Sequence, residues 1–230
     1  MSRIVYFTII TELPITRYGD QPVPNIFFHQ EEGVKTLAVL LPGLNYTCDM
    51  PLLYYFTRLL ELRGADVLQL HANYTSTDFQ TASPLERIQR LSGDGRKEHD
   101  SAVESGLARQ SYTRLVLVGK SIGTLALAHL IGTPNGAEAV TIWLTPLLGQ
   151  PCLVEAAMKS RGPTLFVAWT ADPAFDAAAL ARIQESTGAE AFLVEGANHS
   201  LEIPGDPLGS IRIIGEIMQG LASFLDQHLP

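Results

Sequence analysis

The stretch from Leu115 to Thr124 constrains the fold of this chain more than any other part of its sequence. An apolar, β-branched run stops at Gly119-Lys120-Ser121-Ile122-Gly123, and small residues with helical spacing follow it. This pattern predicts a strand, a tight turn and a helix, with Ser121 at the apex of the turn and its hydroxyl projecting outward. A Cβ atom at Gly119 or Gly123 would collide with the neighbouring strand or helix. Because the five-residue pattern also arises by chance, Ser121 becomes a candidate nucleophile only if suitable partners exist elsewhere in the chain.

Composition indicates one compact domain spanning residues 1–230. Hydrophobic residues make up 46% of the 230 positions and charged residues 17%, which excludes a disordered chain. The net charge of −8 gives no reason to expect a nucleic-acid or membrane partner, and no apolar run approaches the roughly 20 residues of a membrane span. Cys48 and Cys152 are too few for a disulfide framework. We therefore expect a cytoplasmic protein.

Short apolar strands alternate with amphipathic helices along the chain, which predicts an α/β fold with a mostly parallel central sheet and helices on both faces. The first two strands are expected to form an antiparallel hairpin at the N-terminal edge of the sheet. Strands are predicted at Arg3 to Thr11, Val23 to His29, Thr36 to Leu41, Ala65 to Leu70, Arg114 to Val118, Ala137 to Leu144, Thr164 to Thr170 and Ala189 to Val194. Helices are predicted at Asp49 to Arg63, Lys97 to Arg109, Gly123 to Leu130, Cys152 to Lys159, Asp176 to Ser186 and Leu208 to His228.

Two local features of the predicted helices can be tested directly. Asp49 and Asp176 each stand where a helix N-cap belongs. In the last helix, the apolar spacing predicts a set of core contacts: Ile211, Ile214, Ile217, Met218, Leu221, Phe224 and Leu225.

Polar or turn-forming residues stand at the carboxyl ends of several predicted strands. They are Gly43, His71, Ser121, Asp172 and His199. In a parallel sheet these ends lie along one edge, where ligands bind. The sequence therefore predicts a site at this edge.

A serine hydroxyl needs a base to accept its proton, and the base needs an acceptor on its other nitrogen. His199 follows the last strand in a flexible loop and is the predicted base. Asp172, in the turn after the preceding strand, is the predicted acid, with Asp176 as the competitor. Glu195 and Glu202 are near His199 in sequence but would have to fold back onto it.

The oxyanion formed during acyl transfer needs preorganised N–H donors. The backbone N–H of Ile122, directly after the serine, is one candidate. The other is the N–H of Leu44, in the turn at Pro42-Gly43-Leu44-Asn45 that follows the third strand.

With these residues in place, the chain resembles the α/β-hydrolase superfamily over nearly its whole length. Gly119-Lys120-Ser121-Ile122-Gly123 resembles the nucleophile elbow of that family, and the order Ser121, Asp172, His199 matches its order of nucleophile, acid and base. The family often carries His-Gly in its oxyanion loop. In this chain Pro42 stands in place of the histidine, and only the glycine, Gly43, is retained. The resemblance implies the α/β-hydrolase fold and a hydrolytic triad, and it identifies no substrate.

The surroundings of the predicted triad suggest an open site without a substantial cap domain. Only Thr145 to Pro163 separates two strands between which many members of the family insert a helical cap. The loop from Ala72 to Arg96 is the segment that would cover the site. Candidate pocket residues are Gly43, Asn45, His71, Tyr74 and Lys120.

Two residues near the predicted site have competing interpretations. Lys120 either favours an acidic acyl group or pairs with a helix carboxylate, and the pairing is preferred. Cys48 lies near the proposed oxyanion loop and is interpreted as a small buried hydrophobe rather than a reactive thiol.

These residues predict a serine hydrolase that cleaves a small-molecule carboxylic ester or thioester through an acyl-enzyme. The sequence contains no dinucleotide fingerprint, phosphate-binding loop or metal-ligand cluster, so no cofactor and no metal are expected. Two alternatives stay open: an amide or acyl-peptide hydrolase with the same triad, and a non-catalytic binding protein of the same fold. The oligomeric state is left open.

Overall fold

The computed structural model describes residues 8–16, 20–30, 33–71, 81, 95–195 and 198–229. Within these residues, eight strands form one sheet in the order β1-β2-β4-β3-β5-β6-β7-β8. The strands are β1 (Ile9–Thr11), β2 (Asn25–His29), β3 (Thr36–Leu41), β4 (Ala65–Leu70), β5 (Arg114–Lys120), β6 (Val140–Leu144), β7 (Thr164–Trp169) and β8 (Glu190–Val194). β1 pairs with β2 and β2 with β4 in antiparallel fashion, and all other pairs are parallel. The predicted sheet with an antiparallel N-terminal edge is confirmed.

The bounds of the predicted strands lie within two residues of those in the structure, with two exceptions. Residues 3–7 of the first predicted strand lie outside the described residues, and the described part forms β1. The strand predicted from Ala137 begins instead at Val140. The residues before it form successive turns, in which the Gly136 N–H donates to the Thr133 carbonyl and the Ala139 N–H donates to the Gly136 carbonyl.

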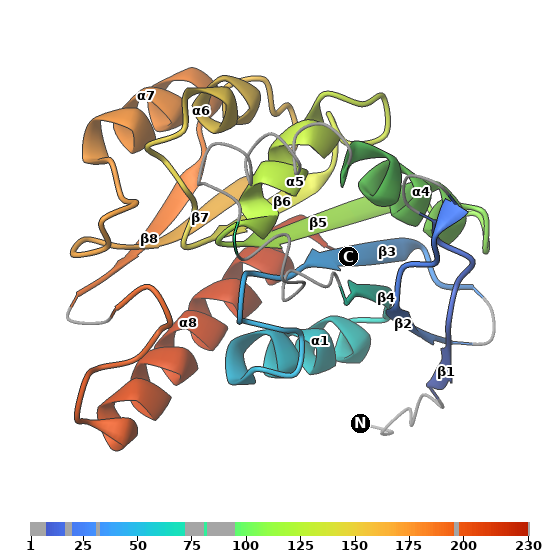
Figure 1. Cartoon of the computed structure of the whole chain (residues 1–230), viewed down its shortest axis with the longest axis horizontal. Helices are drawn as coiled ribbons and strands as arrows, with labels where there is room; N and C mark the ends of the chain where they lie inside the picture. Colours follow the sequence, from blue (N-terminus) through green and yellow to red (C-terminus); the bar gives the residue numbers. More distant parts are fainter. Residues whose placement is uncertain are drawn as a thin grey trace.

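Helices cover both faces of the sheet, as Figure 1 shows. α4 (Gly95–Leu107), α5 (Gly123–Ile131), α6 (Pro151–Ala157) and α7 (Ala177–Thr187) pack on one face. α1 (Pro51–Leu62) and α8 (Pro207–His228) pack on the other. Because both faces are covered, β3, β4, β6 and β7 are buried along their whole length, which explains the nearly continuous apolar sequences of β3, β6 and β7.

Two predicted details of the helices on the second face are wrong. The N-cap of α1 is Met50, which makes no side-chain capping bond, and the helix begins at Pro51 rather than around Asp49. Proline suits this first position because it lacks an N–H and its φ is already helical. In α8, Ile211 is 66% exposed, whereas Ile213 is buried beside the correctly predicted Ile217.

The order of the strands reverses at β3. From β3 the chain crosses to β4 on one side through α1, and it later reaches β5 on the other side through α4. Such a reversal opens a crevice at the carboxyl ends of the two diverging strands, where ligands bind in open α/β sheets. The loop after β3 and the turn after β5 therefore meet at this switch point.

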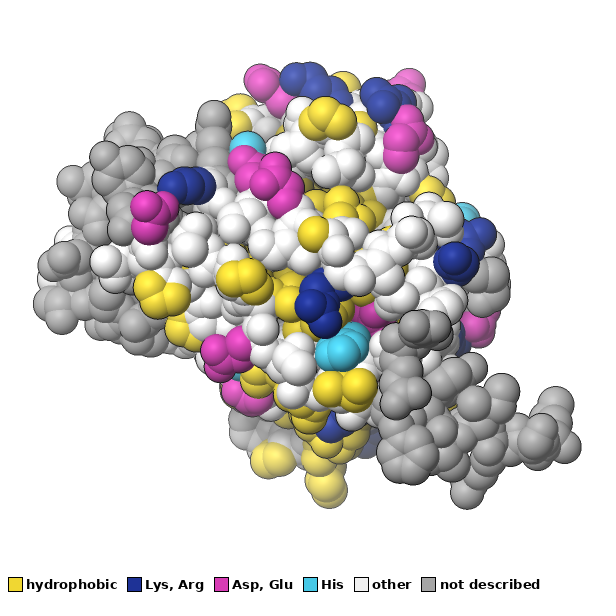
Figure 2. All heavy atoms as spheres, turned by 90° about the vertical axis from the view of Figure 1, so that its right-hand side faces the viewer, with side chains coloured by type: hydrophobic (Ala, Val, Ile, Leu, Met, Phe, Trp, Pro, Cys, Tyr) yellow, Lys and Arg dark blue, Asp and Glu magenta, His cyan; other side chains and the backbone are white. Residues whose placement is uncertain are grey.

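By length and composition, α8 is long and apolar enough to cross a membrane, a criterion that the core helices of globular proteins also meet. Its buried stripe, which includes Ile217, Leu221 and Phe224, packs against the sheet. On the face drawn in Figure 2, basic side chains are interspersed with acidic ones and do not gather in a patch.

Candidate active site

Ser121 occupies the sharp turn between β5 and α5. Its φ is +52°, a left-handed conformation that a non-glycine residue adopts at a cost of about 1–3 kcal/mol. A Cβ at Gly123 would lie 2.1 Å from the Leu41 carbonyl oxygen, and one at Gly119 would lie 2.8 Å from the Gly123 carbonyl oxygen. Gly123 is thus required by the close approach of the end of β3 to the start of α5, and Gly119 by the close approach of β5 to the first residues of α5. The Ser121 N–H also donates to the Leu144 carbonyl at 2.9 Å, which ties the turn to β6.

His199 lies in the loop between β8 and α8, and its side chain is 37% exposed. Its Nε2 is 2.7 Å from the Ser121 Oγ. The two residues are 78 positions apart in the chain and meet because β5 and β8 end at the same edge of the sheet.

Asp172 lies in the turn that follows β7, and its side chain is only 4% exposed. Its Oδ2 is 2.5 Å from the Nδ1 of His199, and its Oδ1 accepts a hydrogen bond from the Ala174 N–H at 2.8 Å. Because a carboxylate can only accept, the imidazole carries its proton on Nδ1, and Nε2 is left to accept from the serine hydroxyl. The competitor Asp176 instead caps α7 and accepts from the Ala179 N–H at 2.9 Å. The predicted capping role of Asp176 is confirmed.

The loop after β3 lies directly beside the serine. A Cβ on Gly43 would be 3.3 Å from both the Ser121 Cβ and the Lys120 carbonyl oxygen. The loop is a tight turn closed by a hydrogen bond from the Gly43 N–H to the Tyr46 carbonyl at 3.0 Å, with Asn45 at a φ of +58°. Asparagine tolerates this conformation better than most residues.

The two predicted oxyanion donors are backbone groups next to this turn and the elbow. Among the described residues, neither the Leu44 N–H nor the Ile122 N–H has a hydrogen-bond acceptor in the protein. Their role as donors to an oxyanion stays a prediction.

Lys120 does not pair with a helix carboxylate, so the preferred prediction for this residue is wrong. It is 1% exposed, and its Nζ donates to the Thr145 Oγ1 at 2.7 Å and to the His199 carbonyl oxygen at 3.0 Å. The ring of Tyr46 faces the ammonium group, with 4.7 Å from Nζ to the ring centroid. Burial lowers the pKa of Lys120 to about 7, although the nearby Asp172 charge acts to raise it.

No protein-family model and no curated protein matches this sequence. Solved structures, in contrast, match it over nearly its full length. A dienelactone hydrolase from Anabaena variabilis superposes with a TM-score of 0.66 at 16% identity, covering 98% of both chains. A serine hydrolase without a lid from Xanthomonas campestris has a TM-score of 0.66 at 14% identity, covering 100% of this chain and 98% of the other. A Pyrococcus furiosus esterase has the same TM-score at 11% identity, covering 98% and 94% of the two chains.

The chain has the α/β-hydrolase fold. Within this fold, residues 145–163 between β6 and β7 carry only the short helix α6, as predicted from the length of the segment. The loop from Ala72 to Arg96, the segment predicted to cover the site, lies almost entirely outside the described residues.

Of the two remaining candidate pocket residues, His71 and Tyr74, the structure describes His71. His71 follows β4, two strands away from β5, and its N–H donates to the Pro24 carbonyl at 2.8 Å. Tyr74 lies outside the described residues.

Cys48 is buried, as predicted, and burial raises the pKa of its thiol. No three histidine, cysteine, aspartate or glutamate side chains in the described part of the chain are placed to hold a metal ion.

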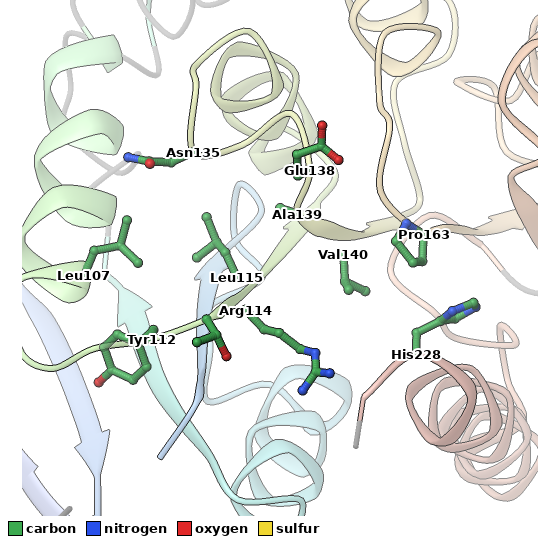
Figure 3. A pocket seen from close by; sticks show the side chains of 11 residues that line it. Leu107, Tyr112, Arg114, Leu115, Asn135, Glu138, Ala139, Val140, Pro163 and His228 are labelled. Atoms are coloured by element: carbon green, nitrogen blue, oxygen red, sulfur yellow. The ribbon is translucent and has the colours of Figure 1, made fainter. Parts of the chain in front are cut away.

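A pocket of about 320 Å³ lies at the opposite edge of the sheet (Figure 3). Arg114 at the start of β5, Val140 at the start of β6 and Pro163 just before β7 line it. The length of β5 separates this pocket from Ser121, roughly 20 Å at the usual rise of a strand. It contains none of the three residues that meet at the elbow.

Sequence reasoning missed Thr145, which accepts the hydrogen bond from Lys120. Thr145 directly follows β6 and has a φ of +43°, which is rare for a β-branched residue. Its position at the carboxyl end of a strand next to β5 was the available signal.

Proposed function

We propose that this chain is a serine hydrolase that cleaves a small-molecule carboxylic ester or thioester. One observation carries the proposal: a continuous chain of contacts runs from the Ser121 hydroxyl through the His199 imidazole to the buried Asp172 carboxylate. The esterases and the dienelactone hydrolase among proteins of the same fold support an ester as the substrate class.

The geometry supports a two-step reaction. The Ser121 Oγ attacks the ester carbonyl while the His199 Nε2 takes its proton, and Asp172 stabilises the imidazolium and keeps the ring in the required orientation. The N–H groups of Leu44 and Ile122 hold the oxyanion of the tetrahedral intermediate. The imidazolium then gives its proton to the leaving alkoxide or thiolate, which leaves an acyl group on Ser121. A water molecule, deprotonated by His199, hydrolyses this acyl-enzyme and releases the acid.

The test compares the wild type with Ser121→Ala on a 4-nitrophenyl ester of a short-chain acid. We expect kcat to fall by about 10⁴-fold or more, because the nucleophile is removed while the fold is retained. Ser186→Ala, on the exposed face of α7, is the matched control and should leave kcat unchanged. Undiminished turnover by Ser121→Ala would refute the proposal.

A fluorophosphonate probe provides an independent readout, since it reacts with serines that are activated by a base. We expect covalent modification at Ser121 in the native wild type and none in Ser121→Ala. An unlabelled native wild type would favour the non-catalytic binding protein instead.

A further inference from the structure

Lys120 lies next to the proposed nucleophile, but nothing in the reaction above requires its charge or its proton. Its side chain is almost completely buried, which is rare for lysine unless its donors are satisfied. The Nζ donates to Thr145 after β6 and to the backbone of His199 in the loop before α8, and it faces the Tyr46 ring in the loop after β3. One side chain from β5 thus joins three separate segments around the elbow.

The bond to the His199 carbonyl ties the backbone of the base directly to β5. The loop is closed on its own residues: the Asn198 N–H donates to the Glu202 carbonyl at 2.8 Å, and the Asn198 Oδ1 accepts from the Ser200 N–H at 2.9 Å. Among the described residues, the Lys120 Nζ is the one polar group of the sheet that binds the backbone of His199. The imidazole must reach both Ser121 and Asp172, so a shift of this backbone would break one of the two contacts.

Thr145 and Tyr46 orient the lysine. The Thr145 N–H donates to the Val167 carbonyl at 2.7 Å, and its hydroxyl accepts from the Lys120 Nζ despite the unfavourable φ of this residue. Strained residues persist only where their surroundings hold them in place, and they cluster at functional sites. The hydroxyl of Tyr46 accepts a hydrogen bond from the Leu52 N–H at 3.3 Å, which ties the ring to α1. The lysine is therefore held from two sides and has little freedom to release His199.

We propose that Lys120 is a positioning residue that holds the backbone of His199, so that its imidazole stays within hydrogen-bond reach of Ser121 and Asp172. This inference rests on the proposed hydrolase function. A neutral amine still has two N–H donors, so both hydrogen bonds persist when Lys120 loses its proton. Among the described residues, the groups around the Lys120 Nζ are the Thr145 hydroxyl, the His199 carbonyl, the Tyr46 ring and the nearby Asp172 carboxylate. Burial raises the pKa of the Tyr46 hydroxyl to about 12.

The test uses Lys120→Met, which keeps the length and apolar stem of the side chain but removes every donor. We expect kcat on the 4-nitrophenyl ester to fall by about 100-fold with KM nearly unchanged, because the base is misplaced by about an ångström while substrate contacts remain. Lys159→Met, at an exposed position after α6, is the matched control and should keep the wild-type kcat. A wild-type kcat in Lys120→Met would overturn the proposal.

A spectroscopic readout separates this inference from the proposed function. We expect the proton between the His199 Nδ1 and Asp172 to give a downfield proton NMR resonance in the wild type, and this resonance to broaden or vanish in Lys120→Met. This measurement applies even to a wild type without ester turnover, a result that would refute the proposed function alone. An unchanged resonance in Lys120→Met would overturn the positioning role whatever the activity.

Thr145→Val supplies a second variant if Lys120→Met fails to fold. It removes the other acceptor of the lysine at nearly constant volume, so we expect a smaller loss of kcat and a weaker downfield resonance. Where both variants fold, the kcat of the double variant should be no lower than that of Lys120→Met alone, since both substitutions act through the same contact. Wild-type values of kcat and of the resonance in Thr145→Val would overturn the proposal.

Discussion

Asp172 and Asp176 are four residues apart after β7, and the structure gives them different neighbours. Asp172 turns inward, contacts the His199 imidazole and is nearly inaccessible to solvent. Asp176 turns toward the backbone of α7 and satisfies one of the free N–H groups at the start of that helix. The carboxylate of Asp172 thus belongs to the proposed active site, whereas the carboxylate of Asp176 stabilises the start of a helix.

Asp172→Asn should lower kcat by about 10³–10⁴-fold with little change in KM. The amide can donate a hydrogen bond to the Nδ1 of His199, which favours the tautomer that cannot accept the serine proton. Steady-state kinetics on the short-chain ester measure the effect. Asp176→Asn is the matched control: asparagine caps helices as well as aspartate does, so kcat and stability should both stay near wild type. Equal losses in the two variants would contradict this assignment of roles.

At the scale of an element, α8 combines a core stripe with an exposed outer face. Ile217, Leu221 and Phe224 repeat at helical spacing and pack against the face of the sheet that α8 covers. Gly215 lies on the exposed face, and a Cβ there would meet no atom within 4 Å. Gly209 lies in the first turn, and a Cβ there would be 2.3 Å from the Oδ2 of the capping residue Asp206.

Gly215→Ala should raise the free energy of unfolding by about 0.5–1 kcal/mol, because alanine loses less backbone entropy than glycine when a helix forms. Urea denaturation followed by circular dichroism measures it. Gly209→Ala is the control in the same helix. Its Cβ would displace the Asp206 carboxylate from the Gly209 N–H, a cap worth about 1 kcal/mol, so we expect no net gain. An equal gain in both variants would show that cap geometry does not matter here.

For the whole molecule, the buried Lys120 makes stability depend on pH. Burial lowers its pKa from 10.5 to about 7 in the folded protein. Below pH 7 both the folded and the unfolded chain carry the proton, and the fold bears the full cost of a buried ammonium group. Between pH 7 and the unfolded value, the unfolded chain binds a proton that the folded chain does not, so the free energy of unfolding rises with pH.

The stability of the wild type relative to Lys120→Met should therefore increase between pH 7 and pH 9. The slope contributed by this one group is at most about 1.4 kcal/mol per pH unit. Taking the difference between the two proteins cancels most other titrating groups, and chemical denaturation at each pH supplies the numbers. Parallel curves for the two proteins would contradict a lowered pKa at Lys120.

The sequence by itself determined the main layout of this protein. Glycine and proline divide the chain into apolar segments, and the spacing of the apolar residues within each segment predicts whether it is a strand or a helix. The result is an alternation of strands and helices. The turn at Ser121 was equally predictable, since Gly119 lacks the Cβ that would collide with the start of α5, and Gly123 lacks the one that would collide with the end of β3. That residues 145–163, between β6 and β7, carry only one short helix also followed from the length of this segment.

Only the tertiary structure decided which side chains meet. The sequence already favoured Asp172 over Asp176, but the partners of Lys120 come from segments 25 and 79 residues away and could not be read from the sequence. Ile211 fits the helical spacing but faces away from the core, because the rotation of α8 on the sheet is fixed by packing rather than by its own sequence. Local sequence governs sterics and periodicity, whereas contacts between distant segments follow from the strand order of the assembled sheet.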